Sequence, residues 1–306
     1  MKTKHLIGLL CLSWMGAILM SSCEKAILDE EEQTTNTQEQ VDNTSKSGKA
    51  NIVLRVSNFI LSDSEDSSTR SVVDLTTYCT RLNFVVYKDG EKVKGLSQKK
   101  EDGGFGEVTM SLDPGTYKLL VLAHSSVGGN PVVSDPEKIQ FTNALGYSDT
   151  FSYYGDLEVT GEAKTHEVML SRNVSCLRFI INDEFPSNVK YMKFFYTGGS
   201  GVLNAVTGYG GNVNSQQEKL VDISSYSTPL TFNLYTFLQQ DEALLQLKVT
   251  ALAEDKKTVI KERPFPDIRL KYRRFSEFEG TFFIDDNGFS ISAETDWGEP
   301  YEHVDY

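Results

Sequence analysis

The chain has 306 residues, which is enough for two domains of ordinary size. Its formal net charge is −13, and a surface this acidic repels phosphates, so nucleic acid is excluded as a partner. Apolar residues make up 39% of the chain and aromatic residues 11%, which is sufficient for a core. The many Val, Thr, Tyr and Phe residues favour strands.

The N-terminus has the layout of a secretory signal. Residues 1–5 are basic, and residues 6–20 form an apolar run that is too short for a transmembrane helix. Ser21, Ser22 and Cys23 follow. This resembles a bacterial lipobox, although Met20 stands where Leu is usual. We therefore expect residues 1–22 to be a lipoprotein signal peptide, cleaved between Ser22 and Cys23, with the lipid on Cys23. Ordinary secretion, with Cys23 as a bystander, is the alternative.

Residues 23–48 are polar and acidic and show no strand or helix period, so we expect a flexible tether. Its segment "LDEEE" (28–32) is similar to the acidic signal that sends lipoproteins of some Gram-negative anaerobes to the outer face. The alternative is that any linker is polar.

A first series of strands follows. Residues 50–61 alternate in part, and residues 62–74 form a Ser/Asp-rich loop. Two hairpins are predicted next, one over 79–95 with a turn at Asp89-Gly90 and one over 107–126 with a type II turn at Pro114-Gly115. Two further strands are expected within 151–172.

A second series begins near residue 173. Strands are predicted within the segments 174–183, 189–199, 227–238, 243–265 and 288–297. Residues 254–257 ("EDKK") form a hairpin turn, and residues 269–283 begin with a charged segment and end in a strand. No run of twelve residues holds a helical period with caps. We expect an all-β chain with two tandem β-sandwich domains, residues 49–171 and 172–306.

Four cysteines are present, and Cys79 and Cys176 lie in the body of the chain. They could form one disulfide, but buried free thiols are the preferred interpretation. No C-x-x-C pair occurs, which argues against a zinc ribbon or a thioredoxin-type site.

Catalytic and cofactor motifs are absent from the sequence. His124 adjoins Ser125 and Ser126, but no G-x-S-x-G elbow occurs, so His124 is interpreted as a strand-end residue. His166 and His303 make no zinc-type pair. The glycine-rich segments introduce no helix that could hold phosphate. We therefore predict no enzyme, no metal and no cofactor.

The acidic pairs of the chain, Asp183–Glu184 and Asp285–Asp286, are expected in turns, where Asp bonds the local backbone.

Several segments together resemble the fimbrillin-like lipoproteins of the type V pilus system in Bacteroidales, above all the minor and anchor subunits. They are "YCTRLNFVVYKDGEKV", "PGTYKLLVLAHSS", "DTFSYYGDLEV", "MKFFYTGGS", "FNLYTF" and "TDWG". The resemblance implies transthyretin-like sandwiches and a surface-exposed, lipid-anchored place at the outer membrane and in the fimbrium. In polymerising members an Arg-specific protease cuts after the first strand, and a strand of the next subunit fills the opened groove. Anchor members keep the lipid.

Arg70–Ser71, in the loop after the first strand, is the candidate processing site. A surface Arg balancing nearby acids is an equal alternative. We expect a non-enzymatic fimbrial subunit, an anchor or an accessory/tip component, which assembles by strand complementation and supports adhesion. Its partners would be other fimbrial subunits, the outer membrane through Cys23, and a host or bacterial receptor.

The alternative function is a glycan-binding lipoprotein of a polysaccharide uptake system. Exposed coplanar aromatic residues on one face would favour it, whereas buried aromatic residues would favour a core. The sequence does not separate stalk, tip and anchor roles.

Overall fold

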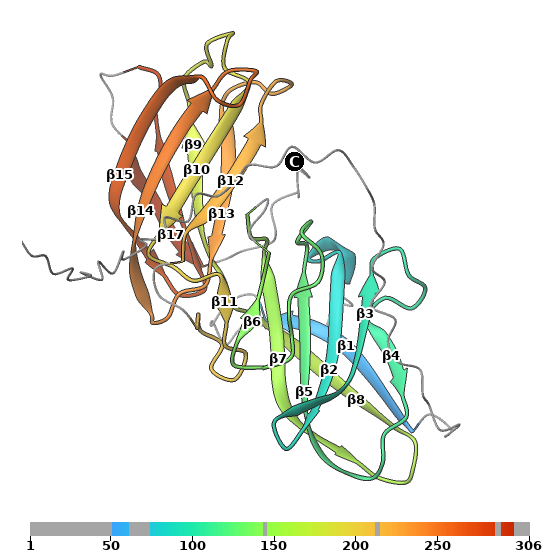
Figure 1. Ribbon diagram of the computed structural model, residues 1–306. Coiled ribbons are helices and arrows are strands. Elements are labelled where there is room, and N and C mark those ends of the chain that lie inside the picture. Colours follow the sequence, from blue (N-terminus) through green and yellow to red (C-terminus); the bar gives the residue numbers. More distant parts are fainter. Residues whose placement is uncertain (1–50, 61–73, 143–145, 212–214, 285–288, 297–306) are drawn as a thin grey trace, which may run out of the picture. The chain divides into compact units, whose positions relative to one another are not determined.

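The computed structural model describes residues 51–60, 74–142, 146–211, 215–284 and 289–296 (Figure 1). Within these residues every named element is a strand except one short 3-10 helix, η1 (Leu75–Thr77). Asp74 caps η1 by accepting a hydrogen bond from the Thr76 backbone N–H. The predicted all-β fold is confirmed.

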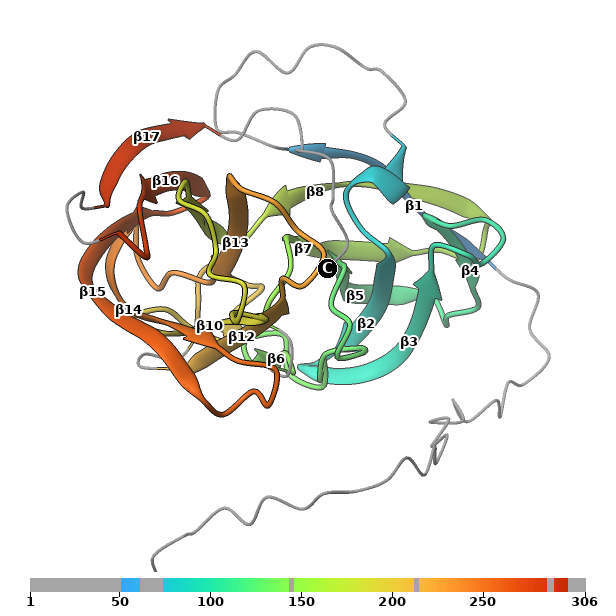
Figure 2. The same cartoon turned by 90° about the horizontal axis from the view of Figure 1, so that it is seen from above.

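The first series of strands forms one seven-stranded sheet in the order β3-β2-β5-β7-β8-β1-β4. The bounds of these strands are β1 Ile52–Ile60, β2 Arg81–Lys88, β3 Glu91–Lys99, β4 Glu107–Met110, β5 Gly115–His124, β7 Thr150–Val159 and β8 Lys164–Arg172. β7 and β8 pair only where Phe151 faces Arg172 and Ser152 faces Ser171, so the sheet bends between them. Figure 2 shows β8 and β1 in one layer and β5, β2 and β3 in the other. The apolar core lies between the layers and draws residues from both.

The hairpin predicted at Asp89-Gly90 is confirmed. Both residues have positive φ values, 52° and 85°, as a type I′ turn requires, and β2 pairs with β3. The hairpin predicted over 107–126 is wrong. β4 pairs with β1, whereas β5 pairs with β2 and β7. Gly115 has a φ of 158°, far from the value of about +80° in a type II turn, so the chain crosses between layers here.

The second series forms two four-stranded sheets in the orders β13-β9-β16-β17 and β12-β10-β14-β15. Their strands are β9 Ser175–Ile181, β10 Tyr191–Thr197, β12 Gln217–Asp222, β13 Leu230–Thr236, β14 Glu242–Leu252, β15 Val259–Lys271, β16 Arg274–Gly280 and β17 Ser290–Asp296. One core cluster, rich in Phe and Leu, contains buried residues of both sheets, among them Phe179 and Leu234 from the first and Phe194 and Val249 from the second.

In this series one predicted turn is confirmed, one predicted segment is corrected, and one strand was not predicted. The turn at 254–257 is confirmed, because Asp255 accepts backbone bonds from Lys257 and Thr258 between β14 and β15. The segment that begins at residue 269 contains a strand, as predicted, but its charged first part is strand as well. It is the end of β15 and the start of β16, joined at Arg273, whose φ is 56°. β12 was not predicted, since its sequence, QEKLVD, has few apolar residues.

The short strands β6 (Ile139–Gln140) and β11 (Val202–Leu203) pair with each other and link the two series. A third core cluster combines residues such as Leu120 and Ile139 with Val174, Leu203 and Phe237. Both series belong to one compact unit.

Candidate strand-exchange groove

The first strand of the chain, β1, lies between two others. It runs parallel to β8, from Ile52 opposite Lys164 to Ile60 opposite Ser171. On its other side it runs antiparallel to β4, from Ile52 opposite Met110 to Arg55 opposite Glu107. Both edges of β1 are therefore hydrogen-bonded over part of its length, and among the described strands β1 alone connects β4 to the rest of the seven-stranded sheet.

The inner face of β1 completes the core. Ile52, Leu54, Val56 and Phe59 are all at most 6% exposed. A register shift between Val56 and Asn58 resets the alternation, which is why Phe59 rather than Asn58 points inward. The Phe59 ring lies 4.9 Å from that of Tyr78 and 4.7 Å from that of Phe151. The four side chains thus fill an apolar slot between β8 and β4.

The outer face of β1 carries a charge junction. Arg55 Nε lies 2.7 Å from Glu107 Oε2 on β4, and its Nη1 lies 3.2 Å from Glu167 Oε1 on β8. The two carboxylates, Glu107 above all, raise the pKa of the Arg55 guanidinium. The three side chains are about half exposed, so solvent weakens the pairs. The pairs matter for the placement of β1, because one residue of this strand contacts both neighbouring strands, β4 and β8.

The far side of β4 has no strand partner among the described residues, and β3 closes it with side chains. Gln98 on β3 donates from Nε2 to the backbone oxygens of Gly104 and Glu107 and accepts from the Gly106 N–H through Oε1. Lys94 Nζ donates to the Ser111 oxygen. These contacts form a seam between β3 and β4 that replaces a regular ladder.

The predicted lipidation and processing residues lie outside the described residues. These are Ser22, Cys23, Arg70 and Ser71. Along the chain, Arg70 stands between Ile60, where β1 ends, and Asp74, where η1 is capped. A cut after Arg70 would therefore separate β1 covalently from every other described strand.

His124 is the last residue of β5, as predicted, and it is fully buried. Its Nε2 lies 3.1 Å from Asn83 Oδ1, and its Nδ1 accepts from the Ser126 N–H. Burial lowers the pKa of this imidazole to about 3. It is a structural residue of the core.

His166 points inward on β8, and its ring lies 6.2 Å from that of Tyr153. His303 lies outside the described residues.

The cysteines and the acidic pair have defined structural places. Cys79 and Cys176 are free and buried, as predicted from the sequence. Asp183 is not a local turn residue. Its carboxylate accepts the backbone N–H groups of Phe282, Phe283 and Ile284, about a hundred positions along the chain. Asp285 and Asp286 lie outside the described residues.

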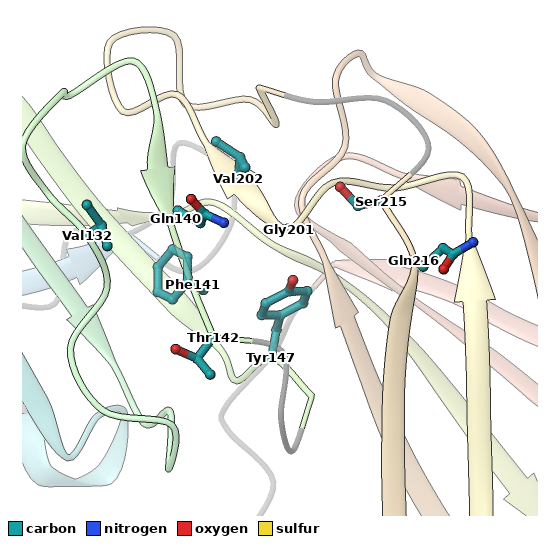
Figure 3. Close-up of a pocket in the computed structure, with 9 residues that line it drawn as sticks. All are labelled: Val132, Gln140, Phe141, Thr142, Tyr147, Gly201, Val202, Ser215 and Gln216. Carbon is teal, nitrogen blue, oxygen red and sulfur yellow. The ribbon is translucent and has the colours of Figure 1, made fainter. Parts of the chain in front are cut away.

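Figure 3 shows a hollow, which is lined by uncharged side chains. Its aromatic members, Phe141 and Tyr147, are only 7% exposed and belong to the third core cluster. Of the described large apolar side chains that are strongly exposed, only one is aromatic, Tyr226. A row of exposed aromatic rings, which the glycan-binding alternative requires, is absent from the described part of the chain.

Within the described ranges no cluster of three or more His, Cys, Asp or Glu residues is arranged to hold a metal ion. The same ranges contain no helix with the length and apolar character needed to span a bilayer.

A family model described as fimbrillin-A associated anchor proteins Mfa1 and Mfa2 matches residues 62–302. The chain belongs to this family. It is accordingly a fimbrial subunit with a non-enzymatic role, located at the cell surface in fimbriae and interacting with other fimbrial subunits. The predicted family resemblance is confirmed.

The chain is also similar to several solved structures. One is the tip fimbrial protein Mfa3 from Porphyromonas gingivalis with C-terminal truncation (14% identity, 80% of this chain and 99% of that chain, TM-score 0.41). Others are a candidate adhesin from Bacteroides ovatus (15%, 72% and 83%, TM-score 0.46) and a candidate polysaccharide-binding protein from Bacteroides thetaiotaomicron (10%, 82% and 99%, TM-score 0.47). A search among curated proteins finds no match.

Arg55, Glu107 and Glu167 were not predicted as functional residues from the sequence. The one signal for Arg55 was a lone basic residue within an apolar run. Its partners lie 52 and 112 positions away, and no local pattern indicates contacts over such separations.

Proposed function

We propose that this fimbrial subunit is lipid-anchored at Cys23 and acts as an anchor or accessory component that assembles by strand complementation. In this proposal the exchangeable strand is β1, and the acceptor is the groove between β8 and β4. The groove belongs to the first of two domains, residues 49–171 and 172–306.

The position of β1 carries the proposal. It is the first described strand, it fills the core with four apolar side chains, and the candidate cut lies between it and the next element. Full burial of such a side chain contributes roughly 1.5–3 kcal/mol, so removal of all four exposes a slot costing on the order of 10 kcal/mol. The unpaired backbone edges of β8 and β4 add to this cost. An incoming strand of matching pattern relieves both.

Processing at Arg70–Ser71 would decide between two roles. In the intact chain β1 is tethered beside its groove and out-competes strands in solution, so the groove stays closed and the lipid on Cys23 stays attached. In the cut chain, the segment from Cys23 to Arg70 is held by non-covalent contacts alone and leaves together with the lipid. The intact form suits an anchor, and the cut form suits a subunit within the fibre.

Mass spectrometry of the protein from the native cell surface tests this proposal. Acylated Cys23 with an intact Arg70–Ser71 bond supports the anchor role, and a mature chain that begins at Ser71 supports an assembled subunit. An unacylated N-terminus at any other position contradicts the proposal. In parallel, Cys23→Ala should release the protein from the outer membrane, and continued membrane attachment would contradict the lipid anchor.

A further inference from the structure

We propose that the groove selects its incoming strand by charge, and that it accepts a strand of another fimbrial subunit with Arg or Lys at the position of Arg55. This inference rests on the proposed strand exchange and adds the chemistry of the partner. The observation behind it is that Arg55 contacts a carboxylate on each wall of the groove, Glu107 on β4 and Glu167 on β8.

Departure of β1 leaves these two carboxylates without their cation. Among the described residues Arg55 is the only basic side chain that forms an ion pair with either of them. The opened groove would then present two negative charges that had shared one guanidinium. A strand with a base at this position restores both pairs, whereas a strand with an acid brings a third carboxylate to them. Like charges placed together in this way are a means of rejecting wrong partners.

The apolar slot sets the remaining pattern of the partner strand. The incoming strand must place apolar side chains inward at the positions of Ile52, Leu54 and Val56. After the register shift that follows Val56, an aromatic ring fits at the position of Phe59, between Tyr78 and Phe151. Ser57 lies at this register shift, and its hydroxyl donates to the Val168 backbone oxygen. The basic residue falls on the outer face, between the second and third apolar positions.

A second copy of this chain does not offer such a strand at its C-terminal edge. β17 is the last described strand and the outermost in its sheet order, and its sequence, SISAETD, contains two acids and no base. If Ile291 and Ala293 take the places of Ile52 and Leu54, Glu294 takes the place of Arg55. Three carboxylates would then meet. The C-terminal strand of another copy is therefore unsuited to the groove.

The test uses the full chain with a site for a sequence-specific protease introduced within residues 61–73. After cleavage, the chain is mixed with an excess of a fluorescent peptide of residues 51–60, and binding is followed by anisotropy as the resident β1 segment is displaced. A second peptide carries Arg55→Glu and a third Arg55→Lys. A charge-reversed chain carries Glu107→Lys and Glu167→Lys. The control chain carries Asp156→Lys, which disrupts an exposed pair of β5 and β7 with Lys118 outside the groove.

We expect the Arg55→Glu peptide to bind roughly tenfold more weakly than the native peptide, and the Arg55→Lys peptide to bind nearly as well. The charge-reversed chain should prefer the Arg55→Glu peptide, and the control chain should keep the native preference. Equal binding of all three peptides overturns charge selection and leaves strand exchange standing. No binding of any peptide to a folded cut chain overturns strand exchange itself, and charge selection with it.

A cut chain that aggregates calls for a second measurement on the intact protein. Arg55→Glu should speed hydrogen exchange of the β1 amides, and adding Glu107→Lys with Glu167→Lys should restore their protection. Unchanged exchange in the single variant overturns the proposal.

Discussion

Arg172, the last residue of β8, forms a buried ion pair with Asp149, the residue that precedes β7. Its Nε lies 2.9 Å from Oδ1, and its Nη2 lies 2.8 Å from Oδ2. The side chains are 1% and 5% exposed, and the guanidinium carbon lies 4.7 Å from the centre of the Phe151 ring. The pair stands at the bend where β7 and β8 make their brief contact, so it holds the two layers of the first sheet at the point where the sheet folds over.

Asp149→Asn should therefore destabilise the protein strongly. The substitution keeps the shape but removes the charge of Asp149 from beside a buried guanidinium, and breaking a buried pair in this way costs about 3–5 kcal/mol. Urea unfolding measures the loss. Asp156→Asn, which disrupts an exposed pair with Lys118, is the matched control and should change stability little. Similar losses in both variants would contradict the special role of the buried pair.

Stability should fall in acid because of His124. The unperturbed pKa is 6.5 and burial lowers it to about 3 in the folded protein. The unfolded chain therefore binds a proton between these values that the folded chain does not, and stability decreases as pH falls from about 6.5 toward 3. The total effect is on the order of a few kcal/mol.

His124→Gln, which retains hydrogen-bonding capacity toward Asn83, should flatten this part of the pH profile in urea unfolding measured at several pH values. His166→Gln, at a less buried site, should leave most of the slope in place. A wild-type slope in His124→Gln would show that other groups cause the acid sensitivity.

Both body cysteines should resist modification in the native state. Burial raises the pKa of Cys79 and that of Cys176 to about 12, so almost no thiolate is present at neutral pH. We expect no alkylation of either residue by iodoacetamide under native conditions and modification of both after denaturation without reductant. A mass lower by two hydrogens in the denatured, non-reduced chain would reveal a disulfide and contradict this prediction.

Gln98 should matter more once β1 has left. In the intact chain β4 is held by β1 as well as by the seam, and the three bonds of Gln98 contribute on the order of 1–2 kcal/mol. In the cut chain without β1, the seam is the principal attachment of β4. Gln98→Ala should then increase hydrogen exchange of the β4 amides well beyond its effect in the intact chain.

Gln246→Ala is the control for Gln98→Ala, because Gln246 makes one exposed bond to Asp267. An equal effect of Gln98→Ala on β4 exchange in the cut and intact chains would contradict the role of the seam.

Local patterns were sufficient for much of the fold. Alternation of apolar residues predicted a strand within residues 50–61, and the need for two positive φ values predicted the turn at Asp89-Gly90. The apolar surroundings of Cys79 and Cys176 indicated buried thiols. Each of these features depends on neighbours in the chain, so the sequence carries the information directly.

The second predicted hairpin failed for a physical reason. Residues 107–124 contain two good strands and a Pro-Gly pair, but the apolar faces of β4 and β5 are buried in opposite layers. Tertiary burial therefore outweighed the local preference of Pro114-Gly115 for a turn.

By itself the sequence determined that the chain is acidic, rich in strands and related to fimbrial subunits, and it marked Cys23 and Arg70 for testing. Only the tertiary structure decided which strands flank β1 and which carboxylates meet Arg55. The parallel pairing of β1 with β8 joins segments more than a hundred residues apart, and its register follows from packing the apolar faces into one core. No local pattern specifies such a pairing.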